Sequence, residues 1–278
     1  MKRWNLIVLG AAVLLCGCMI LAGQRAVATA GWGLSFPVEG QPPAGPLRAE
    51  RLRELGGAYV DAAGGKVLYL TFDAGYENGY TAKILDILKE QQVPAAFFLV
   101  GDYLERNADL VRRMAQEGHT VGNHTMNHPA MTKLDGTAFA GELQGMEQLY
   151  QDITGRTLPK FYRPPQGLYS EENLENARKL GYRTVFWSLA YADWDNQNQP
   201  DPAAAVEKLI ARTHDGAVIL LHSTSATNAE ILPELIGEWK DMGYRFAPLT
   251  ELFSDGCRLL FFRNCATMAP IIPERGTS

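Results

Sequence analysis

From residue 67 to residue 246 the chain alternates between short apolar segments typical of strands and amphipathic segments typical of helices. Parallel strands need a crossover connection, usually a helix, so this alternation predicts a parallel α/β fold. Seven such units in series predict a distorted (β/α)7 barrel, with an open doubly wound sheet as the alternative. The expected strands are residues 67–72, 95–100, 119–122, 160–163, 183–189, 217–221 and 244–246.

Helix boundary signals separate these strands. Pro94 ends one helical segment, and Gly118 and Gly155 end two others. Ser170 is an N-cap followed by two glutamates, and Asp201 is an N-cap followed by proline at the first helical position. The expected helices are residues 47–55, 81–91, 108–117, 137–154, 171–180, 202–214 and 230–242.

Residues 1–30 have the composition of a leader. Lys2 and Arg3 precede an apolar run over residues 6–22, and Ala-Thr-Ala at 28–30 offers a small-residue cleavage site. We expect a signal peptide or an uncleaved membrane anchor, and Leu-Cys-Gly-Cys at 15–18 also leaves a lipoprotein leader open. The protein is therefore expected outside the cytoplasm, either secreted or anchored by this segment.

The rest of the chain divides into three parts. Residues 31–64 form an extended lead-in with several prolines and glycines, residues 65–254 form one α/β domain, and residues 255–278 form a tail. Cys257 and Cys265 in the tail are eight residues apart. Outside the membrane they would form a disulfide or stay as free thiols, and the sequence does not choose between the two.

The charge of the chain argues against nucleic acid as a partner. The leader holds three basic residues and no acidic ones, so the remainder carries 23 basic and 31 acidic residues. The basic residues are not clustered, whereas nucleic-acid binding depends on a basic surface. We expect a monomer whose only membrane contact is through its N-terminal segment.

Polar side chains follow five of the expected strands at their carboxyl ends. They are Asp73, His124, Arg163, Asp193 and His222, which follow the first, third, fourth, fifth and sixth strands in turn. Because the carboxyl ends of parallel strands meet at one mouth of a barrel, we expect these groups to converge. Such a concentration of polar groups is typical of an active site.

His124 and His128 are four residues apart, a spacing that on a helical turn places both imidazoles on one face. Pairs of this kind bind zinc and similar divalent metals. In isolation the pair is a weak signal. Its position beside the other strand ends favours a site for a divalent metal cofactor, zinc or similar.

Arg163 is followed by two prolines, which fix the backbone and lack N–H donors. The amide of Gln166 then remains as a donor for a substrate oxyanion. Arg163 would pair with Asp73 and keep that carboxylate ionised and oriented. A structural salt bridge without a catalytic role is the alternative.

His222 ends an apolar strand, so it is either a satisfied core histidine or a functional group. Asp193 offers a carboxylate that would orient His222 and keep it protonated as a general acid. A carboxylate base, a histidine acid and a metal that polarises a carbonyl together suit the hydrolysis of an amide or ester.

The residues at these five strand ends, in this order, resemble the motifs of the polysaccharide deacetylases. These are the carbohydrate esterases of family 4, which have the rhizobial chito-oligosaccharide deacetylase-type domain. The resemblance covers about residues 65–254 and implies a distorted barrel that hydrolyses N- or O-acetyl groups on polymeric sugars. Carried over by position, it implies Asp73 as general base, His124 and His128 as metal ligands, Arg163 as the group orienting the base, Asp193 as the partner that tunes the general acid His222, and Leu220 and Trp194 as walls of the acetyl pocket.

Ala74 departs from the family pattern. The usual first motif is Thr-Phe-Asp-Asp-Gly, whose second aspartate binds the metal, and an alanine cannot coordinate an ion. Ala74 followed by Gly-Tyr-Glu-Asn-Gly-Tyr at 75–80 resembles one branch, the δ-lactam-biosynthetic de-N-acetylases of spore-forming bacteria. That resemblance implies removal of acetyl from N-acetylmuramic acid in peptide-stripped peptidoglycan, a step towards the muramic δ-lactam of spore cortex.

Two other functions stay open at this point. A deacetylase acting on N-acetylglucosamine polymers or xylan would carry the same strand-end residues. A non-catalytic glycan-binding relic would account for Ala74 but not for the retained Asp73 and His222. Two neutral imidazoles should hold a metal weakly, unless a water, Asp73 or the lactyl carboxylate of the substrate completes the coordination.

Overall fold

A computed structural model of the protein describes residues 29–36 and 38–254. Most of the expected leader, and the expected tail with Cys257 and Cys265, lie outside these residues. Within the described ranges, none of the helices combines the length and the apolar character that crossing a bilayer requires.

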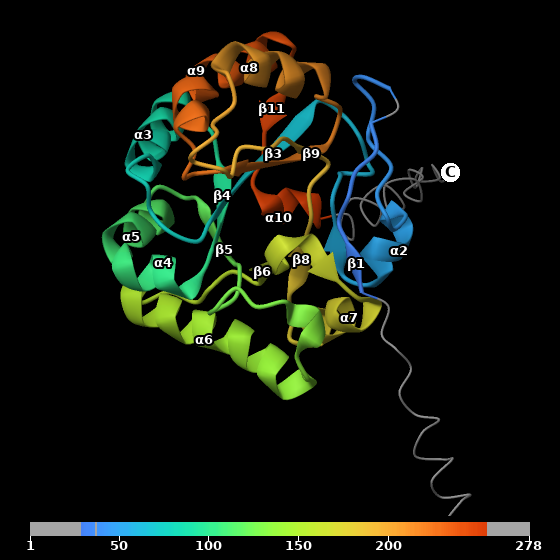
Figure 1. The fold of residues 1–278 in the computed structure, drawn as a ribbon, viewed down its shortest axis with the longest axis vertical. Helices are drawn as coiled ribbons and strands as arrows, with labels where there is room; N and C mark the ends of the chain where they lie inside the picture. Colours follow the sequence, from blue (N-terminus) through green and yellow to red (C-terminus); the bar gives the residue numbers. More distant parts are fainter. Residues whose placement is uncertain (1–28, 37, 255–278) are drawn as a thin grey trace, which may run out of the picture.

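One curled sheet of parallel strands forms the centre of the molecule (Figure 1). From β3 to β8 the neighbouring strands follow chain order, so successive crossovers all move in one direction around the sheet. A doubly wound sheet would reverse direction at its centre, and the distorted barrel is thereby confirmed. The sheet order is β2 (Gly57–Ala58), β8 (Arg183–Val185), β6 (Phe161–Tyr162), β5 (Thr120–Asn123), β4 (Ala95–Leu99), β3 (Val67–Ala74), β10 (Ala217–His222) and β9 (Leu189–Ala190), with β11 (Arg245–Phe246) also paired to β3.

The barrel is joined across its seam by isolated contacts instead of a full ladder. Val60 forms a single antiparallel bridge to Ala217 at the start of β10. The segment between β8 and β9 crosses the same gap, because Phe186 N–H donates to Ala58 O at 2.9 Å and Ser188 N–H donates to Val218 O at 2.9 Å. The expected continuous strand at 183–189 is therefore wrong: its two ends pair with different neighbours.

Helices surround the outside of the sheet, and a short one, α10, lies near the middle of the view, inside this ring (Figure 1). Most lie where the sequence predicts them. The short helices α4 and α10 were not predicted, and α9 begins four residues before its expected start. The helices are α2 (Ala49–Glu54), α3 (Thr81–Gln91), α4 (Gly101–Arg106), α5 (Ala108–Gln116), α6 (Gly136–Thr154), α7 (Glu171–Lys179), α8 (Pro202–Ala211), α9 (Ala226–Asp241) and α10 (Leu249–Leu252).

Strand alternation places Asp73 at the mouth of the barrel. Successive side chains of β3 point to opposite faces, and Leu70, Phe72 and Ala74 pack in the apolar layer beneath the outer helices. Tyr69, which precedes Asp73 by four residues, belongs instead to the smaller apolar cluster on the inner face of the sheet. Asp73 shares the inner face with Tyr69, and it is the last residue of that face before the strand ends.

Candidate active site

A cavity of about 510 Å³ opens at the carboxyl ends of the strands. Seven of the nine site residues predicted from the sequence line this cavity. The other two, Arg163 and Asp193, contact lining residues from behind the cavity wall. The cavity is lined by Asp73, His124, His128, Pro164, Gln166, Gly167, Trp187, Ala190, Tyr191, Trp194, Leu220 and His222.

Asp73 and Arg163 form a buried ion pair, with 2.6 Å between Oδ1 and Nη1. The Arg163 side chain is fully buried; its Nε donates to Val185 O at 3.0 Å, and its guanidinium lies 4.2 Å over the Phe98 ring. Burial alone would raise the pKa of Asp73, but the positive charge of Arg163, assisted by His124 and His222, lowers it below its usual range. Asp73 is therefore ionised at neutral pH.

His124 is neutral and has a defined tautomer. Its Nδ1 lies 2.8 Å from the carbonyl of Arg163, which only accepts, so Nδ1 carries the proton. Nε2 then presents its lone pair 3.7 Å from Asp73 Oδ2. Complete burial lowers the pKa of His124 to about 4 despite the nearby carboxylate, and burial also lowers the pKa of His128.

The loop that carries the two histidines is strained and is not helical. Thr125 and His128 have φ of 72° and 54°, and among described residues the other non-glycine positions with positive φ are Gln92 and Gln166. Thr125 Oγ1 accepts a 2.9 Å bond from the His128 amide, which fixes the turn. The expected helical turn is thus wrong, yet the imidazole centroids lie 5.0 Å apart. Left-handed residues near active sites are held by their surroundings.

Asp193 orients His222 through two hydrogen bonds. Its Oδ1 lies 2.7 Å from His222 Nδ1, and its Oδ2 accepts from the His222 main-chain amide at 2.8 Å. Burial lowers the pKa of His222, but the hydrogen bond and charge of Asp193 outweigh it and raise the pKa above its ordinary value. His222 is therefore suited to hold a proton at neutral pH and to release it to a substrate.

Asn228 and Tyr191 complete this group and were not assigned from the sequence. Asn228 Nδ2 donates to Asp193 Oδ2 at 2.6 Å and to His222 O at 3.0 Å. Tyr191 donates its hydroxyl proton to Asn228 Oδ1. Asn228 lies in the first turn of α9, where no motif marks it, and only its contact with Asp193 identifies it.

The three residues expected to bind substrate all line the cavity. Leu220 is 6% exposed and forms part of the floor, whereas Trp194 is 65% exposed at the rim. Gln166 has φ 60°, and within the described ranges its main-chain N–H has no hydrogen-bond acceptor. That amide remains available for a ligand.

The donor set does not form a complete metal site. His124 and His128 supply two imidazoles, Asp73 is engaged by Arg163, and Ala74 packs in the apolar layer outside the barrel. Among described residues no group of three or more His, Cys, Asp and Glu side chains is placed to hold an ion. Deacetylases of carbohydrate esterase family 4 generally depend on a metal, so the residues present differ from that pattern.

An ionised carboxylate and an imidazole whose pKa is raised by Asp193 thus face one cavity at the mouth of a parallel barrel. This is the arrangement of a hydrolase that uses general acid–base chemistry. The sequence pattern of the family described as polysaccharide deacetylase matches residues 61–185. Peptidoglycan-N-acetylmuramic acid deacetylase PdaA of Bacillus subtilis is 38% identical over 244 residues, which cover 85% of this chain and 93% of that protein. The chain belongs to the polysaccharide deacetylase family.

Solved structures support the same assignment. The structure of Bacillus subtilis PdaA, a family 4 carbohydrate esterase, superposes with a TM-score of 0.77 at 37% identity and covers 82% of this chain and 98% of that one. A family 4 pseudoenzyme from Bacillus anthracis gives a TM-score of 0.66 at 27% identity, with 72% and 69% covered. A peptidoglycan-N-acetylglucosamine deacetylase of Bacillus cereus is 34% identical in sequence over 66% of this chain and 67% of that protein.

Proposed function

We propose that this protein removes the N-acetyl group from N-acetylmuramic acid in peptide-stripped peptidoglycan, and so supplies the free amine needed for muramic δ-lactam in spore cortex. The observation that carries the proposal is the pairing of Asp73 with Arg163 and of His222 with Asp193 at one cavity. The coverage of 93% of a Bacillus subtilis N-acetylmuramic acid deacetylase supports the choice of substrate.

Asp73 acts as the general base. Its lowered pKa keeps it ionised, and Arg163 holds one carboxylate oxygen at 2.6 Å while the other faces the cavity near His124. That second oxygen takes a proton from water as the water attacks the acetyl carbonyl. General base catalysis of this kind contributes roughly 10²–10⁴-fold to a rate.

His222 acts as the general acid, and the Gln166 amide stabilises the developing oxyanion. The raised pKa of His222 favours the protonated ring, and Nε2 gives its proton to the sugar nitrogen as the carbon–nitrogen bond breaks. The products are acetate and a free amine. The Gln166 N–H, left without an acceptor among the described residues, donates to the carbonyl oxygen as it gains charge.

Leu220, Trp187 and Trp194 form the apolar part of the cavity that receives the acetyl methyl group. Trp194, exposed at the rim, contacts the sugar ring. His124 and His128 remain as the imidazole pair that a divalent metal would meet, and no step above is assigned to an ion because the donor set is incomplete. With peptidoglycan as its substrate, the protein would act outside the cytoplasm.

Acetate release from defined polymers tests the proposal. Wild-type protein should release acetate from peptide-free muramic glycan strands faster than from chitin oligomers, xylan or peptide-bearing peptidoglycan. Asp73→Asn should lower the rate by about 10²–10⁴-fold, while Asp86→Asn, which changes an exposed carboxylate on α3, should leave it unchanged. Thermal unfolding of both variants shows whether they are folded.

Two outcomes would favour other functions. Faster release from N-acetylglucosamine polymers would place the protein with the N-acetylglucosamine deacetylases, to one of which it is 34% identical. Binding of muramic strands without acetate release would identify a glycan-binding relic, a function suggested by the incomplete donor set and by the likeness to a family 4 pseudoenzyme.

A further inference from the structure

The segment from Ala30, the last residue of the expected leader, to Trp32 packs against the wall of the cavity. β1 (Ala30–Gly31) pairs in antiparallel register with β7 (Leu168–Tyr169). The next residue, Trp32, continues this contact, because its main-chain N–H donates to Gly167 O at 2.9 Å. Gly167 and Gln166 line the cavity, so the N-terminal segment is attached directly to the loop that carries the Gln166 amide.

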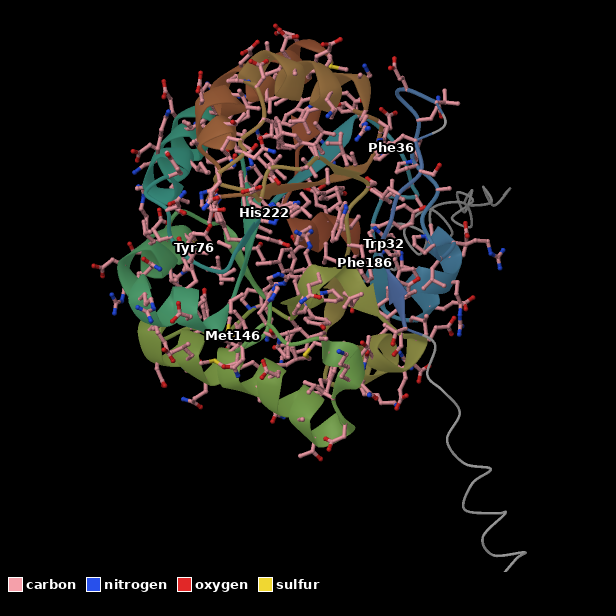
Figure 2. The ribbon with its side chains drawn as sticks, in the orientation of Figure 1. Trp32, Phe36, Tyr76, Met146, Phe186 and His222 are labelled. Carbon is pink, nitrogen blue, oxygen red and sulfur yellow. The ribbon has the colours of Figure 1, made fainter. Side chains whose placement is uncertain are left out.

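The Trp32 indole contacts a second wall of the same cavity. It stacks on the Phe186 ring with 4.1 Å between the ring centroids and an interplanar angle of 18°. Figure 2 labels the two residues next to each other. Its Nε1 donates to the carbonyl of Trp187 at 3.0 Å, and Trp187 also lines the cavity. Trp32 is 6% exposed and is not itself among the lining residues.

Little free space is left between these walls. A Cβ placed on Gly167 would lie 2.9 Å from the Trp187 ring and 3.2 Å from Trp32 Cβ. Gly167 has φ 65° and Gln166 has φ 60°, and a left-handed glutamine is unfavourable unless its surroundings hold it. The packing around Trp32 therefore holds Gln166 and Trp187 in their positions.

We propose that Trp32 is a positioning residue for deacetylation, a clamp that holds the Gln166 loop and Trp187 at a fixed separation across the cavity. It never touches substrate. It acts through the Gln166 amide and the Trp187 wall, so the inference rests on the function proposed above. A displacement of about 1 Å in such groups lowers a rate by about 10²-fold, and loss of one hydrogen bond from the clamp should produce part of that effect.

Trp239 provides a matched control. It is 0% exposed in the layer between the sheet and the outer helices, and its Nε1 donates to Thr213 Oγ1 at 2.8 Å. Trp32→Phe and Trp239→Phe therefore each remove one indole hydrogen bond from a buried tryptophan and keep an aromatic ring. A purely structural role for Trp32 would make the two variants behave alike.

The test measures kcat and KM on the best acetylated polymer, thermal unfolding, and hydrogen exchange of the segment 164–169, in which residues 166–169 carry the exchanging amides. All three use the full chain. We expect Trp32→Phe to lower kcat about ten-fold and to speed exchange at 164–169. Trp239→Phe should keep kcat within about two-fold and leave that exchange unchanged, although its unfolding temperature falls.

Unchanged kcat and unchanged exchange in Trp32→Phe would overturn the clamp, as would equal losses of kcat in the two variants. If the wild-type protein releases no acetate from any polymer, the proposed function is refuted, but the positioning role of Trp32 is not. Hydrogen exchange then tests the positioning role of Trp32. Faster exchange at 164–169 in Trp32→Phe only would support it, and equal exchange in both variants would refute it.

Discussion

Burial of the Asp73–Arg163 ion pair is energetically unfavourable, and this free-energy cost is evidence for the role of the pair. Taking two charges out of water costs several kcal/mol per ion before their attraction is counted. In addition, Arg163 Nη2 is buried and has no hydrogen-bond partner within the described residues. A pair kept only for stability would be replaceable by apolar side chains. Its position at the cavity favours a role in chemistry.

The pH profile of kcat/KM should have limbs set by Asp73 and His222. Activity is lost as pH falls through the lowered pKa of Asp73, below 3.8, and as pH rises through the raised pKa of His222, above 6.5. Asp193→Asn removes the charge that raises the His222 pKa, and burial then lowers it, so the basic limb should move to lower pH.

Asp195→Asn is the control for that profile, because Asp195 is an exposed neighbour that bonds to the Gln197 amide and does not contact His222. It should leave both limbs in place. A basic limb that stays fixed in Asp193→Asn would show that another group supplies the proton.

Zinc binding should be weak in this protein. Two neutral imidazoles supply no negative charge to a cation, and Asp73 is already paired with Arg163. Calorimetric titration of Zn²⁺ into chelator-treated protein should give weaker binding than in a relative with a complete two-histidine, one-aspartate set. His128→Ala should abolish it. Binding as tight as in that relative, or binding that persists in His128→Ala, would contradict the prediction.

The turn between β3 and α3 is stabilised by hydrogen bonds of Glu77 and Asn78, two residues of the motif at 75–80. Glu77 Oε1 accepts from the amides of Gly79 and Thr81 at 2.7 and 3.2 Å, and its Oε2 accepts from Tyr103 at 2.9 Å. Asn78 donates to Thr224 O, in the loop after β10, at 3.0 Å. The Gly-Tyr-Glu-Asn-Gly-Tyr motif therefore fixes the loop that follows Asp73.

Glu77→Ala should lower the free energy of unfolding by about 1–2 kcal/mol, because it removes a carboxylate from the amino end of α3 and leaves Tyr103 without its acceptor. Urea unfolding measures the change. Glu90→Ala, on the exposed side of the same helix, should change it by less than about 0.5 kcal/mol. Equal effects in the two variants would show that the motif does not stabilise the helix.

For the whole molecule, the lead-in is part of the barrel. Leu52 of α2 is 0% exposed and packs in one cluster with Trp32 and Phe186, and β2 adds an edge to the main sheet. A Cβ on Gly57 would lie 2.7 Å from Leu52 Cδ1, so the packing there is close. Contacts of this kind couple residues 47–60 to the strands that end at the cavity.

Leu52→Ala should therefore destabilise the entire domain by about 2–5 kcal/mol, because it leaves a cavity in that cluster. Differential scanning calorimetry should show one transition at a lower temperature. Glu50→Ala on the exposed face of α2 is the control and should leave the transition in place. Two separate transitions in Leu52→Ala would mean that the lead-in folds independently.

The sequence alone determined the order of the main strands and helices, because hydrophobic periodicity and capping are local signals, but it missed short elements such as α4 and α10. It also determined which strand ends carry Asp73, Arg163, Asp193 and His222, since parallel topology brings those ends together. Tertiary structure decided the rest. The strand over 183–189 divides because its two halves pair with different strands, and the histidine loop takes left-handed turns held by Thr125. Asn228 and Trp32 act on the site across 35 and 155 positions of sequence, distances over which no local pattern carries information.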